Sequence, residues 1–157
     1  MATPQAGHVF DLQVRRTFPD PRERIFAAWT QREHLAKWMC RATPQHRAEY
    51  LEHDLRPGGR YRIQIAAPNG DRLLIFGEYR EIRPAEKVSF TWQCERTPAT
   101  GGSPVNETGE TLVTVEFFDR GQQTEVLLTH TGFFNAETRD RHQRGWNGCF
   151  DTLASVL

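Results

Sequence analysis

The chain has 157 residues, and twenty basic side chains balance twenty acidic ones. This length suits one domain with its own buried core, so we expect a single domain over residues 1–157. The balanced charge argues against nucleic-acid or anionic-membrane binding. No apolar stretch is long enough to span a bilayer, and the first ten residues lack the regions of a secretory signal, so we expect a cytoplasmic protein.

The N-terminal part predicts a strand followed by two short helices. Apolar residues alternate with polar ones over residues 9–18, which favours a strand with one dry face, and residues 1–8 before it are expected to be flexible. Asp20 and Glu23 have the spacing of a capping box, and Thr30 and Glu33 repeat it. Two short amphipathic helices are therefore expected, one after Asp20 and one after Thr30.

From residue 48 onward the pattern has a period of two, which predicts six strands joined by turns rich in glycine, proline, asparagine and aspartate. The expected strands are residues 48–55, 60–66, 73–82, 87–94, 111–118 and 124–130. Sequential strands on short links usually pair antiparallel, so we expect a meander. Residues 95–109 are rich in proline, glycine and small polar residues and are expected to form a mobile surface loop.

The C-terminal segment predicts one long helix. Asn135 offers a cap, and a helical stripe follows at spacings of four, three and four: Trp146, Phe150, Leu153 and Leu157. Gly145 and Gly148 each weaken this helix by about 1 kcal/mol relative to alanine, so tertiary packing must favour it. Glycines at these positions would let a strand or a ligand approach closely.

This order of elements, together with several short motifs, resembles the SRPBCC or START-like (Bet v-like) helix-grip superfamily. Within it, the chain resembles the branch similar to the C-terminal domain of the activator of heat-shock protein 90 ATPase. The matching motifs span nearly the whole chain and lie at residues 21–29, 56–61, 77–84, 90–92 and 145–146. The resemblance implies an α+β helix-grip fold, in which a curved antiparallel sheet wraps around the long C-terminal helix. It also implies a cavity between the two that takes hydrophobic ligands in various relatives, but no common reaction.

Alternation predicts which strand residues face the C-terminal helix. They are Tyr61, Ile63, Ile65, Val88, Phe90, Trp92, Val113, Val115, Phe117, Val126, Leu128 and His130. For residues 73–82 the alternation is ambiguous, so either Phe76 with Glu78 or Gly77 with Tyr79 points inward. This choice decides how polar the cavity is.

The candidate cavity residues are aromatic side chains with a few polar groups among them. They are Trp38, Tyr61, Phe76, Glu78, Trp92, Phe117, His130 and Trp146. The alternative is that the aromatic residues simply fill the core, that His130 is a hydrogen-bonded structural histidine, and that Glu78 points into solvent.

The leading hypothesis is binding of a small apolar molecule or lipid whose identity the sequence does not specify. One alternative is a stress- or chaperone-associated interaction protein, although the chain lacks the long N-terminal domain of the eukaryotic co-chaperone. Another is a cyclase- or hydrolase-type enzyme that uses Glu78, His130 or Tyr61 for acid and base work. Homodimerisation through an exposed sheet edge also stays open.

We assign no catalytic residue, cofactor or metal. The potential metal ligands between residues 46 and 54 alternate between the two faces of a strand, and Cys149 is too far along a helix from His142 for a direct hydrogen bond. Three widely spaced cysteines do not suggest a disulfide framework. The basic run Arg139, Arg141 and Arg144 is interpreted as a solvated helix face rather than a nucleic-acid site.

Overall fold

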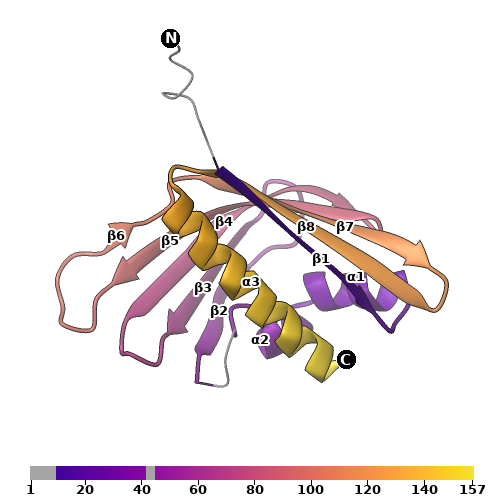
Figure 1. Ribbon diagram of the computed structural model, residues 1–157, viewed down its shortest axis with the longest axis horizontal. Helices are drawn as coiled ribbons and strands as arrows, with labels where there is room; N and C mark the ends of the chain where they lie inside the picture. The colour runs from indigo at the N-terminus through magenta and orange to yellow at the C-terminus, as the bar shows by residue number, and fades with distance from the viewer. Residues whose placement is uncertain (1–9, 42–44) are drawn as a thin grey trace, which may run out of the picture.

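The computed structural model describes residues 10–41 and 45–157, which form a curved antiparallel sheet and three helices (Figure 1). This is the α+β helix-grip architecture that the sequence predicts. The expected flexibility of residues 1–8 and the expected strand start at residue 9 lie outside the described residues. No helix within the described ranges is long and apolar enough to cross a membrane.

The strands follow one another through the sheet with few departures from chain order. They are β1 (Phe10–Phe18), β2 (Arg47–His53), β3 (Arg60–Ala66), β4 (Arg72–Arg83), β5 (Lys87–Thr97), β6 (Val105–Asn106), β7 (Thr111–Arg120) and β8 (Gln123–Phe133). The order in the sheet is β1-β8-β7-β5-β4-β3-β2, and the short β6 pairs with β5. The predicted meander is confirmed, and β1 extends it beyond β8.

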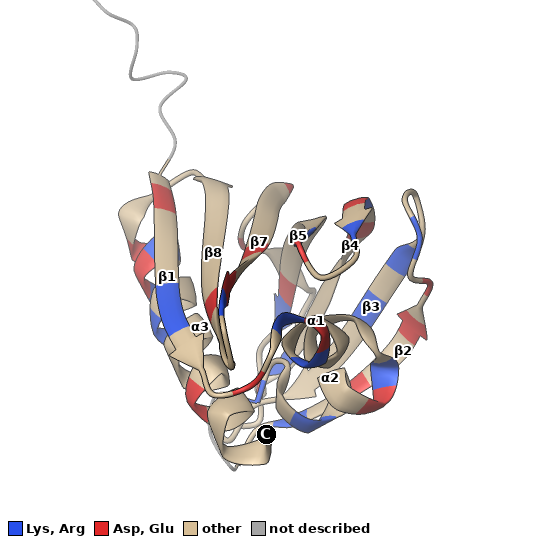
Figure 2. Cartoon of the chain, turned by 90° about the vertical axis from the view of Figure 1, so that its right-hand side faces the viewer, with Lys and Arg blue, Asp and Glu red and all other residues tan. Residues whose placement is uncertain are grey.

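Two short helices, α1 (Arg22–Thr30) and α2 (Arg32–Trp38), cover one end of the sheet (Figure 2). The prediction of capping boxes at Asp20 and Thr30 is wrong. Pro21 has extended backbone angles and is itself the cap of α1, so the helix begins one residue later than an Asp20 cap requires. Thr30 is still helical, and its hydroxyl donates a hydrogen bond to the Phe26 carbonyl, 2.8 Å away. Gln31 then occupies the cap of α2 without a side-chain bond.

The long helix α3 (Ala136–Val156) lies across the concave face of the sheet, and its C-terminal end is close to α2 (Figure 1). The Asn135 cap is confirmed, because its side chain accepts a hydrogen bond from the Thr138 amide at 2.8 Å. In the predicted apolar stripe, Trp146, Phe150 and Leu153 are buried, and the last member is half-buried. All the strand residues predicted to face the helix are buried as well.

The ambiguity in β4 is resolved by its pairing with β3, in which Tyr61 stands opposite Gly77. Since Tyr61 is buried on the inner face, Gly77 and the buried Tyr79 share that face, while Phe76 and Glu78 lie on the outer one. A Cβ atom at Gly77 would collide with the Thr91 carbonyl oxygen. The Tyr61 hydroxyl donates to this same oxygen at 2.6 Å.

The segment 95–109, expected to be a surface loop, is partly tied to the sheet. β5 continues through Glu95 and Arg96, and these two residues pair with β6. The Thr108 hydroxyl accepts a hydrogen bond from the Cys94 amide at 3.1 Å. These bonds hold the end of the segment against β5, beside the interior space under α3.

Candidate functional site

The interior between the sheet and the helices is filled at one end and open at the other. At the filled end, Trp29 packs edge to face against Trp38 and stacks on Trp146, with ring centroids 4.6 Å and 6.1 Å apart, and a void of about 10 Å³ lies beside it. Toward β3, β4 and β5, a cavity of about 330 Å³ separates the sheet from α3. This volume falls in the range of small-molecule sites, which begins near roughly 300 Å³.

Buried apolar side chains form the walls of this cavity. Ile65 and Ile75 line it from β3 and β4, and Met39 lines it from the turn after α2. Trp92 of β5 and Trp146 of α3 meet at its inner end, with ring centroids 5.1 Å apart. A ligand in this space would contact large, rigid apolar surfaces.

Gly145 explains why α3 does not close the gap. It lines the cavity, and a Cβ atom added to it would have no heavy atom within 4 Å outside its chain neighbours and the backbone of its own helix. The glycine therefore leaves open space where any larger side chain would project into the cavity.

A hydrogen-bond chain fixes His130 behind the cavity wall. Its Nδ1 accepts from the Trp146 indole N–H at 3.1 Å, and an indole N–H can only donate. The His130 proton must therefore be on Nε2, which donates to the Thr111 hydroxyl at 2.8 Å. That hydroxyl donates in turn to the Trp92 carbonyl at 2.7 Å. Every polar atom of this histidine is satisfied in its neutral form.

His142 of α3 forms a second, similar bond at the wall itself. Its Nε2 accepts from the Trp92 indole N–H at 3.2 Å, so its Nδ1 carries the proton and donates to the Thr138 carbonyl at 3.0 Å. Burial lowers the pKa of both His130 and His142 below the ordinary histidine value. Both indole donors of the cavity are thus occupied, and only the faces and edges of the rings remain for a ligand.

All three cysteines reach this cavity from distant parts of the chain: Cys40, Cys94 and Cys149. Burial raises the pKa of all three thiols, to about 12 for Cys94 and Cys149. A protonated thiol is a poor nucleophile and behaves as a small apolar group. Among the described residues, no three histidine, cysteine or acidic side chains are grouped to hold a metal ion.

Charged side chains lie at the edge of the cavity, where the surface becomes exposed. Arg96 bridges Asp71 at 2.8 Å and Glu107 at 2.9 Å, and Glu107 also lies 3.4 Å from Arg141. A hydrogen bond from the Ala99 amide and the Arg96 guanidinium lower the pKa of Asp71. Arg144 lines the same edge and is exposed. We call Arg96, Glu107, Arg141 and Arg144 the charged rim.

The structure divides the sequence-predicted cavity residues into several groups. Trp92 and Trp146 line the cavity, and His130 lies directly behind them. Tyr61 borders the small void instead. Trp38 and Phe117 pack into the filled end around Trp29.

Phe76 and Glu78 are on the outer face of the sheet, where Glu78 lies 3.9 Å from Arg80. Glu78, His130 and Tyr61 therefore do not converge on one acid–base site. The Glu78 carboxylate therefore lies outside the cavity.

Several lining residues were not selected from the sequence, although signals for them exist. His142 and Cys149 extend the α3 stripe, because they lie four residues before and three residues after Trp146. Cys94 continues the alternation from Trp92. Arg144 carries no such signal, because an arginine on a helix is usually just solvated.

Comparisons with solved structures support the fold. A protein from Rhizobium loti superposes with a TM-score of 0.78 at 22% identity, covering 96% of this chain and 98% of its own. A protein from Chromobacterium violaceum and the AHSA1 protein from Silicibacter pomeroyi each give a TM-score of 0.77 at 21% identity, covering 94% of this chain and 97% of theirs. At this identity the likeness concerns the fold alone.

The sequence comparisons go further than the fold. No curated protein matches the chain. The family described as Activator of Hsp90 ATPase homolog 1-like protein matches residues 20–157, which include every helix and every strand except β1. The chain therefore belongs to the Activator of Hsp90 ATPase homolog 1-like family.

Proposed function

We propose that this protein binds a small, largely apolar molecule in the cavity between α3 and strands β3–β5. The main support for this proposal is that one part of the interior is filled by side chains and another part is not. One end is filled by indole rings in contact with one another, while the other keeps about 330 Å³ open. Protein interiors are normally close-packed, so an apolar space of this size that opens to the surface offers a ligand contacts that the protein does not make itself.

The chemistry of the walls supports binding rather than covalent reaction. The two histidines are held neutral by their hydrogen bonds, and the thiols are protonated. The helix-grip resemblance, in which various relatives take hydrophobic ligands, agrees with this proposal. Free buried thiols also fit a reducing compartment, and cytoplasmic location is part of the proposal.

The experiment uses N-phenyl-1-naphthylamine, a neutral aromatic probe whose fluorescence rises in apolar surroundings. We expect saturable binding to the wild-type chain. In Gly145→Leu the new side chain fills the cavity, so probe affinity should fall at least about tenfold, a loss of about 1.4 kcal/mol.

Gly145→Ala is the matched control, because it makes the same helix more favourable but adds only one carbon atom. It should bind the probe nearly as well as the wild type. Equal affinity of the leucine and alanine variants would show that the probe binds elsewhere and would refute the proposed site.

A further inference from the structure

The charged rim has an excess of positive charge in a chain whose net charge is zero. Three of its members are arginines and one is a glutamate, and these are the charged residues that line the cavity. Glu107 is shared by Arg96 and Arg141 at 2.9 Å and 3.4 Å. The single carboxylate of the rim is thus already used by two arginines.

Arg144 differs from the other two arginines of the rim. Arg96 has carboxylates on both sides, and Arg141 also lies 3.4 Å from Glu137. In the part of the chain that the structure describes, Arg144 has neither an ion pair nor a hydrogen-bond acceptor. The acidic residue one turn earlier, Asp140, is bound by Arg139 at 2.6 Å.

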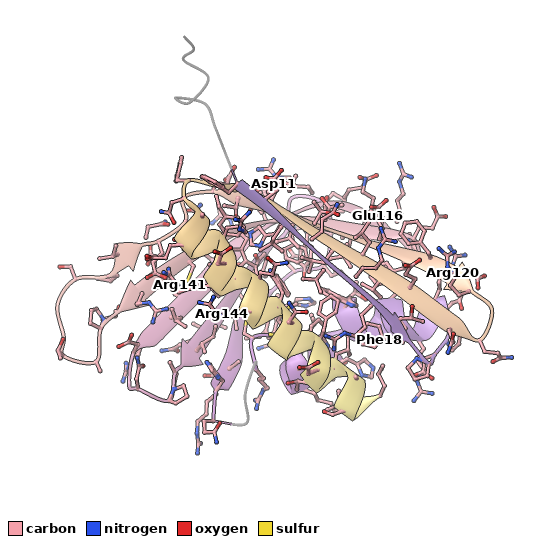
Figure 3. All side chains as sticks on the ribbon, viewed as in Figure 1. Asp11, Phe18, Glu116, Arg120, Arg141 and Arg144 are labelled. Carbon is pink, nitrogen blue, oxygen red and sulfur yellow. The ribbon has the colours of Figure 1, made fainter. Side chains whose placement is uncertain are left out.

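Arg141 and Arg144 are close enough on α3 to act on one group. They are three residues apart, which places them on neighbouring positions of one helix face. Figure 3 shows both on the side of α3 that faces β4 and β5. A planar guanidinium offers paired donors that match the two oxygens of a carboxylate.

The hydrogen bonding of the cavity walls indicates which end of a ligand would bind these arginines. The indole N–H groups of Trp92 and Trp146 already donate to histidines, so neither is free for a polar head. An anion placed deep in the cavity would lose its hydration without compensation. The head group must therefore stay at the rim, with the apolar body inside.

We propose that the ligand is an amphipathic carboxylate, whose head group is bound by Arg144 beside Arg141 while its apolar body fills the cavity. This inference rests on the proposed function and names the class of molecule that the same site takes.

The test compares decanoate with decan-1-ol, which differ only in the head group, as competitors that displace N-phenyl-1-naphthylamine at pH 8. For the wild type, decanoate should displace the probe at roughly three- to tenfold lower concentration than the alcohol. Arg144→Gln should abolish this preference and leave displacement by decan-1-ol unchanged. Arg144→Glu should reverse the preference.

Arg62→Gln is the matched control, since it removes one exposed arginine from the outer face of β3. It should keep the wild-type preference for the carboxylate. Equal displacement by the acid and the alcohol in the wild type would overturn the inference while leaving the apolar site intact. A preference that survives in both Arg144 variants would overturn the role of Arg144, and absence of probe binding to the wild type would overturn both proposals.

Discussion

The two histidines beside Trp92 and Trp146 show how single residues keep the cavity neutral. His130 and His142 each accept an indole N–H, and a protonated ring could not do so. Burial lowers the pKa of both in the folded state. Protonation is therefore opposed by lost hydration and by a lost hydrogen bond at the same position.

This arrangement predicts a loss of stability toward acid pH. The unfolded histidines take up protons near pH 6.5, above the folded pKa, so the unfolded state binds more protons as the pH falls through that value. Stability from these residues is complete above about pH 6.5 and declines below it, by at most about 1.4 kcal/mol per pH unit for each histidine. Urea unfolding between pH 7.5 and 5.5 measures this slope.

His142→Gln should reduce the slope, because glutamine has an oxygen that can accept from Trp92 but does not titrate. His34→Gln, which changes an exposed histidine of α2, is the control. A slope that is the same in His142→Gln as in the wild type would contradict the assignment.

The thiols give a second test at the residue scale. With pKa values raised to about 12, Cys94 and Cys149 hold very little thiolate at pH 8. We expect iodoacetamide to modify them more than about a hundredfold more slowly in the native chain than in urea, as followed by mass spectrometry of peptides. Native modification at the unfolded rate would show that these thiols are not buried.

At the scale of elements, α3 carries a glycine that is unfavourable for the helix. Gly145→Ala should stabilise the protein by about 1 kcal/mol, because alanine is the better helix former and its Cβ atom meets open space. Urea unfolding measures the change.

Gly121 in the turn between β7 and β8 is a control with the opposite sign. A Cβ atom there also meets open space, but the φ angle of +81° strains any other residue, so Gly121→Ala should destabilise by about 1 kcal/mol. If the two alanine substitutions changed the free energy of unfolding by the same amount, the low helix propensity of glycine would not explain the effect at Gly145.

The strands were predictable because their inner and outer faces differ. Alternation identified the inward residues of β3, β5, β7 and β8 correctly, since the inner face of each strand carries mainly apolar side chains and the outer face mainly polar ones. It failed to decide β4, where apolar side chains such as Phe76 lie on both faces. The helix starts were misplaced because Pro21, not Asp20, takes the cap of α1.

For the whole molecule, the location of the site followed from the sequence only in part. Alternation showed that Trp92 faces α3, and helical spacing showed the same for Trp146, but neither pattern gives the distance between helix and sheet. That distance depends on how side chains from different elements fill the space, as Trp29 and Trp38 do at one end. Phe117 and Trp38 point inward like true lining residues and yet belong to the filled end.

The most direct test of ligand binding between α3 and the sheet is a crystal structure of the chain grown with N-phenyl-1-naphthylamine. We expect the probe between α3 and β5, in contact with Trp92, Trp146 and the backbone of Gly145, with Arg144 at the open edge. A structure in which α3 rests directly on β4 and β5, or in which the probe lies on the outer face beside Phe76, would contradict this expectation.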